Sequence, residues 1–321
     1  MSIAVWPAVS PSDLRLKAAE TQERELEWIV QETLEVCRDL KHGLDDCYAL
    51  LAPIDPGSTL VVSTPRNEKV KGTLTRVGTR IVKGTLNLQL RTIPAQHLSL
   101  APNDSIHIDA LESLHTHLTQ ATDLLSITLS RPQDPRSLDS TLAILADSIA
   151  DSLALLKGPP IDKPDPGWQG SSCPPHQFHP IAGTNLSIYI NIQESSIVVW
   201  LRALEPVDAP VHFGTKLGLA IGTFRRLEHD EMDTIFRYNC RGSEAAGSRP
   251  RSARHTPEPR AAPPPFGENK DIQQVYVREK VRIESADPSL ISLHSKLGFL
   301  SHMLGQTRRN LTAVMGVDSD D

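Results

Sequence analysis

LVVSTPRNEKVKGTLTRVGTRIVKGTLNLQL, residues 60–90, carries an internal repeat. The six residues VKGTLT at 70–75 return as VKGTLN at 82–87. The dipeptide Val77-Gly78 between the copies favours a tight turn, so the copies can fold back on each other as a hairpin. Leucines at 86, 88 and 90 alternate with polar residues, which is the period of a strand with one buried face. The stretch therefore predicts an antiparallel β-meander.

The composition is that of an ordinary soluble protein. With 321 residues, of which 39% are hydrophobic and 22% charged, the chain can build one elongated core or two small ones. A formal net charge of -6 and only 4% aromatic residues argue against a nucleic-acid or anionic-lipid surface. No stretch is apolar enough to span a bilayer, and the start does not resemble a signal peptide. Four scattered cysteines favour a reduced cytosolic protein.

Four segments have apolar residues spaced alternately three and four apart, as along one side of a helix. The first spans 12–52, the second and third lie within 103–157, and the fourth spans 287–316. Asn103-Asp104 has the chemistry of an N-cap for the second helix. Such wide apolar stripes can be buried against one another. We therefore expect an antiparallel four-helix bundle.

A second group of strands is expected between the third and fourth helices. Residues 186–192 and 197–203 alternate apolar and polar positions around a turn at Glu194-Ser195, and 217–224, 234–238 and 275–283 are further candidates. We expect residues 59–91 and 184–284 to form one mostly antiparallel β region attached to the bundle, which makes the fold class α+β. Residues 241–271 are rich in proline and arginine, and we expect them to be a disordered insertion.

Known catalytic motifs are missing, so we expect a protein that is not an enzyme and has no cofactor. The spacing of Cys173, His176 and His179 could suit Zn²⁺ if Cys240 or His212 supplied a fourth ligand. A proline-rich linker with solvated histidines is the favoured interpretation, because no second pair of ligands lies nearby.

Leucines at 290, 297, 304 and 311 repeat every seventh residue, as in a leucine zipper. A second row at 293, 300 and 314 widens the apolar stripe, which favours packing within the chain over a dimeric zipper. A homodimeric scaffold of the leucine-zipper type remains the alternative function.

Basic residues recur along the meander of this acidic protein. They form a candidate partner-binding strip of Arg66, Lys69, Lys71, Arg76, Arg80 and Lys83. Such a strip can steer association with acidic partners. The equally simple interpretation is that these residues solvate the strands and guard sheet edges.

Several strings together resemble the Rogdi family. They are Ser63–Gly72, Glu25–Val30, Leu186–Asn191 and Val277–Leu290, whereas residues 241–271 have no counterpart that resembles the family. The resemblance implies a small, non-catalytic accessory subunit of the RAVE complex, which promotes assembly of the peripheral and membrane sectors of the vacuolar proton-translocating ATPase. The implied partners are the large propeller-bearing RAVE subunit, the peripheral sector of the pump and a Skp-type adaptor. The implied location is the cytoplasm, with recruitment to vacuolar or endosomal membranes.

Overall fold

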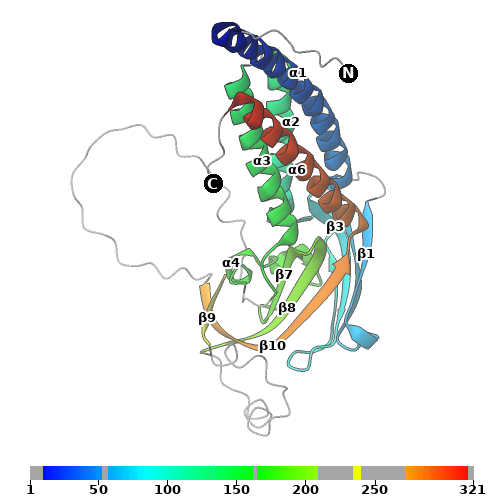
Figure 1. Ribbon diagram of the computed structural model, residues 1–321. Coiled ribbons are helices and arrows are strands. Elements are labelled where there is room, and N and C mark those ends of the chain that lie inside the picture. Colours follow the sequence, from blue (N-terminus) through cyan, green and yellow to red (C-terminus); the bar gives the residue numbers. More distant parts are fainter. Residues whose placement is uncertain are drawn as a thin grey trace, which may run out of the picture. The chain divides into compact units, whose positions relative to one another are not determined.

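The computed structural model describes residues 10–52, 57–132, 134–161, 165–208, 234–239 and 272–316. These residues fall into two compact units. The helical unit consists of the described parts of Met1–Ala52, Leu111–Leu156 and Ser289–Asp321. The sheet unit consists of the described parts of Pro53–Ala110 and Lys157–Pro288. Figure 1 shows their helices and strands along the chain.

The helices of the helical unit are α1 (Pro11–Leu51), α2 (Asp109–Leu129), α3 (Pro135–Lys157) and α6 (Pro288–Met315). Helix α1 begins where Ser10 Oγ accepts a hydrogen bond from the backbone N–H of Asp13 at 3.1 Å, with Pro11 in the first helical position. Each helix buries most of the row of apolar residues that its spacing predicts, while Leu26, Val30, Leu153 and Val314 of these rows are half-exposed.

The second half of α1 contacts α6 and α2. Gly43 allows a close approach to α6, because a Cβ there would lie 2.5 Å from Leu300 Cδ2. Asp46 of α1 forms an ion pair with Lys296 of α6, and Tyr48 Oη lies 3.1 Å from His115 Nε2 of α2. Helix α1 therefore contacts α6 and α2 through the buried Gly43 and through the exposed Asp46 and Tyr48.

The prediction of an antiparallel four-helix bundle with an attached β region is wrong. The described residues form an α+β structure with five helices and two antiparallel sheets, in a mixed arrangement, and the helices are not a four-helix bundle. Helix α1 has 41 residues against 21 in α2, and its described residues before Leu26 are all exposed. The fifth helix, α4 (Trp168–Ser171), belongs to the sheet unit. An amphipathic stripe determines which side of a helix is buried, but not how helices match in length and number.

The meander sheet contains β1 (Ser58–Ser63), β2 (Val70–Val77), β3 (Arg80–Leu88), β4 (Gln96–Leu100) and β6 (Phe178–His179), paired in that order, and β5 (Ile106–His107) pairs with β3. A short 3-10 helix, Pro65–Asn67, links β1 to β2, and another, Pro175–Gln177, precedes β6. Val70 pairs with Leu88 and Thr73 with Thr85. Gly78 has a φ of 58°, as a tight hairpin turn requires. The predicted meander is confirmed.

The expected start of the second helix is wrong. Asn103-Asp104 does not cap α2, which begins at Asp109. Ile106 and His107 lie between them and pair with β3 as the strand β5. No helix follows this dipeptide directly, because the next residues pair with β3 as a strand and their backbone is extended.

The hairpin sheet runs in the order β7 (Leu186–Gln193), β8 (Ser196–Pro206), β10 (Ile272–Ala286) and β9 (Phe236–Asn239). The predicted turn at Glu194-Ser195 is confirmed, with φ values of 48° and 59°. A bulge in β10 shifts its register with β8 between Val277 and Glu279. The strand candidate at 217–224 and the predicted insertion at 241–271 lie outside the described residues.

Two carboxylates from β10 and its end tie the two sheets together. Glu279 Oε1 accepts from Lys69 Nζ at 2.8 Å, and its Oε2 accepts from the backbone N–H of Arg91 at 2.7 Å. Asp287 forms a fully buried ion pair with Arg76 of β2. No helix in the described part of the chain is long and apolar enough to cross a membrane.

Candidate partner-binding surface

One face of the meander sheet is open to solvent. Along β2, Lys71 and Thr73 are exposed and alternate with buried Val70, Gly72 and Leu74. The same alternation continues across the neighbouring strands. Exposed or half-exposed residues form what we call the threonine–lysine face: Thr59, Val61, Lys71, Thr73, Thr75, Lys83, Thr85, Asn87, His97, Ser99 and His179.

Hydroxyl pairs cross this face from strand to strand. Thr73 Oγ1 lies 3.1 Å from Thr85 Oγ1, which is its direct partner in the register. Thr59 Oγ1 of β1 lies 3.2 Å from Thr75 Oγ1 in the same way. Cross-strand threonine pairs of this kind stabilise a sheet and hold its surface groups in place. The face is therefore a rigid array of hydrogen-bonding groups.

The face is also cationic. Lys71 lies opposite Asn87, and Lys83 lies opposite Thr75, so the two ammonium groups flank the central Thr73–Thr85 pair. His97 Nδ1 lies 2.5 Å from Asn87 Oδ1. As the structure describes this face, none of its residues is an Asp or a Glu, although the chain carries a net charge of -6. It is thus a local positive region that attracts acidic groups.

The structure separates the six residues of the predicted strip. Lys71 and Lys83 lie on the threonine–lysine face. Arg80 is exposed at the hairpin end of β3, and Arg66 is exposed in the 3-10 helix before β2, 4.0 Å from Glu68. Lys69 is the cation that binds Glu279 in the contact between the two sheets.

Placing Arg76 in a solvent-exposed strip is wrong, because its side chain is fully buried. Its Nε donates to Asp287 Oδ2 at 2.7 Å and its Nη1 donates to the carbonyl oxygen of Gly78 at 2.6 Å. Asp287 Oδ1 also accepts from Ser58 Oγ at 3.1 Å. The period of the strand explains the error: Arg76 shares the inward side of β2 with Gly72 and Leu74.

Several residues of the threonine–lysine face were missed by sequence reasoning. Period-two alternation could have added Thr73 and Thr85, which lie between outward positions already recognised. His179 joins the face only because β6 pairs with β4 across a long sequence separation, with Ser99 opposite His179. A strand of two residues is too short to show the alternation of apolar and polar residues from which strands are predicted.

The possible metal ligands are not brought together in the described part of the chain. Cys173 is buried, burial raises its pKa to about 12, and its backbone N–H donates to Ile188 at 2.7 Å. His179 is exposed on β6. The described residues contain no group of three His, Cys, Asp or Glu that could hold an ion, while Cys240 and His212 lie outside them.

The heptad leucines lie inside the protein. Leu290, Leu297, Leu304 and Leu311 are completely buried, as is Leu293 of the second row. A zipper seam has to be exposed in one copy to meet another copy. This row therefore supports the fold of the chain itself and is not available to a second chain.

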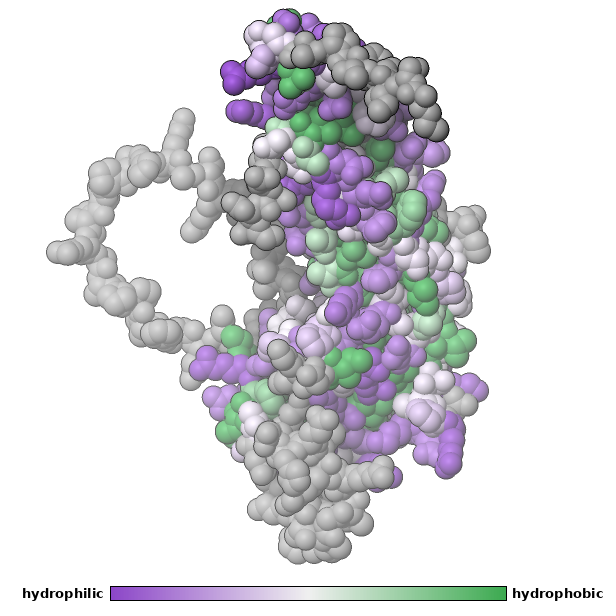
Figure 2. All heavy atoms as spheres, viewed as in Figure 1, coloured by the Kyte–Doolittle hydropathy of each residue, from purple (hydrophilic) through white to green (hydrophobic). Residues whose placement is uncertain are grey.

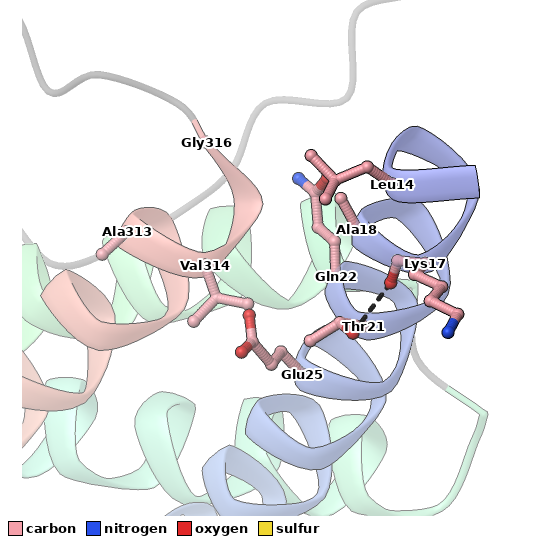
Figure 3. Close-up of a pocket in the computed structure, with 9 residues that line it drawn as sticks. All are labelled: Leu14, Lys17, Ala18, Thr21, Gln22, Glu25, Ala313, Val314 and Gly316. Carbon is pink, nitrogen blue, oxygen red and sulfur yellow. Dashed lines mark hydrogen bonds between the residues drawn. The ribbon is translucent and has the colours of Figure 1, made fainter. Parts of the chain in front are cut away.

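In the helical unit, an opening lies between the start of α1 and the end of α6 (Figure 3). Its volume is about 720 Å³, and Leu14, Ala18 and Val314 line it together with the charged Lys17 and Glu25. Leu14 is 61% exposed. On the face of the molecule in Figure 2, such hydrophobic residues lie in small groups among hydrophilic ones. The opening offers a shallow mixed surface.

Comparison with protein families places the chain in a known family. The model of the family described as Rogdi leucine zipper containing protein matches residues 25–312. The match runs from α1 to α6 and includes both described sheets. No curated protein matches the sequence. Because the family model spans nearly the whole chain, the protein belongs to the Rogdi family.

Proposed function

We propose that this protein is a non-catalytic accessory subunit of a RAVE-like complex. In this role it promotes assembly of the peripheral and membrane sectors of the vacuolar proton-translocating ATPase. Membership of the Rogdi family supports the proposal, since the resemblance implies this role. The structural observation that carries it is the threonine–lysine face, a rigid cationic surface suited to holding another protein.

The partner for this face is the large propeller-bearing subunit of the complex. Through that subunit the protein reaches the peripheral sector of the pump and a Skp-type adaptor, and it is recruited from the cytoplasm to vacuolar or endosomal membranes. We expect the docking segment of the large subunit to be acidic, because Lys71 and Lys83 meet no carboxylate on the described face.

The chemistry of the face suits reversible docking. Exposed charges at an interface mainly accelerate association and make it depend on salt, while hydroxyl and amide groups fix the register of the partner. The paired threonines pay little entropy on binding, since their side chains are already held in the free protein. Assembly factors that have to release their partner benefit from this combination.

The test is charge reversal at the two lysines of the face, Lys71→Glu with Lys83→Glu. We expect a folded protein whose affinity for the purified large subunit falls by about tenfold or more, with a weaker dependence on salt. In cells that carry this variant, vacuoles or endosomes should acidify more slowly. The matched control is Lys17→Glu with Arg24→Glu, which changes the net charge equally on exposed positions of α1.

Two different results would contradict the two parts of the proposal, the binding surface and the role in pump assembly. A folded Lys71→Glu/Lys83→Glu variant that still captures the large subunit as well as the wild type removes this face from the interface. Normal acidification in cells that lack the protein entirely overturns the assembly role itself.

A further inference from the structure

The first turns of α1 are exposed on every side. All residues from 11 to 25 are exposed, and Leu14 is 61% exposed. The family model begins to match at residue 25, so family membership does not account for these turns. Most helical stability in proteins comes from the packing of an apolar side, and a helix of about 12–15 residues alone is marginal in water. A partner would therefore stabilise these turns.

One side of α1 near its start carries three residues at heptad spacing, Leu14, Thr21 and Trp28. Residues at this spacing lie along the same side of a helix, and Trp28 is 61% exposed. Lys17 and Glu25 lie on this side as well, each one helical turn from Thr21. We call these five residues the α1 face.

The α1 face borders the opening between α1 and α6. Leu14 and Glu25 point from α1 toward the end of α6, and Val314 lies across the opening (Figure 3). The Thr21 hydroxyl donates to the carbonyl oxygen of Lys17 at 2.8 Å, so another helix can pack on it without leaving that donor unsatisfied. Within the described residues, neither the Lys17 ammonium nor the Glu25 carboxylate forms an ion pair. Both charges are therefore available to a partner.

The α1 face is complementary to itself. In an antiparallel pair of helices related by a two-fold axis at Thr21, residues equally far on either side of Thr21 lie at the same level. Leu14 of one copy then lies level with Trp28 of the other, and Lys17 lies level with Glu25. A parallel pair would place Lys17 beside Lys17 and Glu25 beside Glu25, and like charges destabilise such a contact. The order of the residues therefore favours an antiparallel second copy.

We propose that the α1 face binds the same face of a second copy of the protein in an antiparallel pair. Leu14 of each copy packs on Trp28 of the other, and Lys17 of each copy forms an ion pair with Glu25 of the other. The opening beside α6, with a volume of about 720 Å³, leaves room for these side chains. Every contact of this interface occurs twice, as in two-fold dimers of identical chains.

The expected dimer is weak. Two helix faces of about four turns bury less area than a standard interface, so we expect a Kd of about 10–100 μM. The contact differs from a leucine zipper through the heptad row of α6, because the leucines of that row are buried within the chain. It also lies on a different element from the threonine–lysine face and does not depend on the function proposed above.

The experiment is sedimentation equilibrium of the full chain at concentrations from about 1 to about 500 μM, over which the wild type should pass from monomer to dimer. Lys17→Glu or Glu25→Lys alone should weaken dimerisation by about tenfold or more, because each sets like charges against each other in both ion pairs. Combining the two substitutions should bring the Kd back to within about threefold of the wild type, because opposite charges then face each other again.

The matched controls lie on other sides of the same turns. Arg15→Glu and Glu23→Lys change the net charge by the same amounts at exposed positions and should leave the Kd unchanged. Leu14→Ala should weaken dimerisation by about fivefold. Leu16→Ala should not, because Leu16, which is 63% exposed, lies on another side of the helix. All these positions are exposed, so each variant should keep the fold, which circular dichroism checks.

A protein that stays monomeric at the highest concentration would overturn the proposal and assign the α1 face to a partner other than a second copy. Equal weakening by Lys17→Glu and Arg15→Glu would reduce the effect to general charge repulsion and overturn the face. A double substitution that fails to restore the dimer would overturn the antiparallel pairing. Lys17→Glu should capture the large subunit as well as the wild type does, so this inference and the proposed function fail in different measurements.

Discussion

The two copies of the repeated hexapeptide in the meander have nearly the same sequence but different surroundings. The first copy, at 70–75, lies in β2 between β1 and β3, and the second, at 82–87, lies in β3 between β2 and β4. Their central threonines, Thr73 and Thr85, are paired with each other. Their glycines and the residues that follow them have different roles, because antiparallel pairing places each copy against different neighbours.

The glycines show the difference most directly. A Cβ on Gly72 would overlap the backbone carbonyl of Thr85, whereas a Cβ on Gly84 would meet the end of the Leu74 side chain at 2.8 Å. Position 72 requires a glycine because any side chain there would collide with the backbone of β3. At position 84 the nearest atom belongs to a side chain, which can move aside. After the first copy comes Arg76, buried in an ion pair with Asp287, while the equivalent position after the second copy is the buried apolar residue Leu88. Similar sequence therefore does not mean a similar contribution to the fold.

The largest effect should come from breaking the buried ion pair after the first copy. We expect Arg76→Met to destabilise the protein by about 3–5 kcal/mol, because it leaves the Asp287 carboxylate buried without its cation. Urea unfolding measures the loss. Lys83→Met in the second copy is the control and should change stability by less than about 0.5 kcal/mol. An Arg76→Met protein as stable as the control would show that the pair is unimportant for the fold.

The glycines provide the second test. Gly72→Ala should cost about 1–3 kcal/mol, since backbone atoms of β3 have to move, and Gly84→Ala should cost less than about 1 kcal/mol. Thermal unfolding of the two variants under the same conditions gives the comparison. Equal losses would mean that the two copies are constrained alike.

A smaller effect is expected at Lys69, just before the first copy. Its side chain is 35% exposed, and Glu279 keeps its bond to the backbone N–H of Arg91 when the lysine is removed. Lys69→Met should therefore cost about 1 kcal/mol, well below the loss for Arg76→Met. A loss in urea unfolding as large as that of Arg76→Met would contradict this ranking.

The smallest effect on stability is expected for Lys71→Gln combined with Lys83→Gln. Both side chains are exposed, so the double variant should unfold within about 0.5 kcal/mol of the wild type. The same variant should bind the large subunit less tightly if the threonine–lysine face is the interface. A clear loss of stability would place these lysines among the structural residues instead.

Much of the local structure could be predicted from the sequence. The meander, the turns at Gly78 and at Glu194-Ser195, and the buried side of each long helix follow from local patterns, and the structure confirms them. The four-helix bundle was wrong because spacing within a helix carries no information on the helices around it. The cationic strip was partly wrong because net charge was considered without strand alternation, which places Arg76 on the inward side.

The sequence by itself determined the elements that depend on neighbouring residues: hairpins and amphipathic faces, together with the family resemblance. Only the tertiary structure decided which cations are buried and which surfaces combine distant strands. His179 reaches the threonine–lysine face through β6, and Trp200 meets Lys280 through the pairing of β8 with β10. The physical reason is that periodicity and turn chemistry act over a few residues, whereas sheet registers and ion pairs join residues that chain sequence leaves far apart.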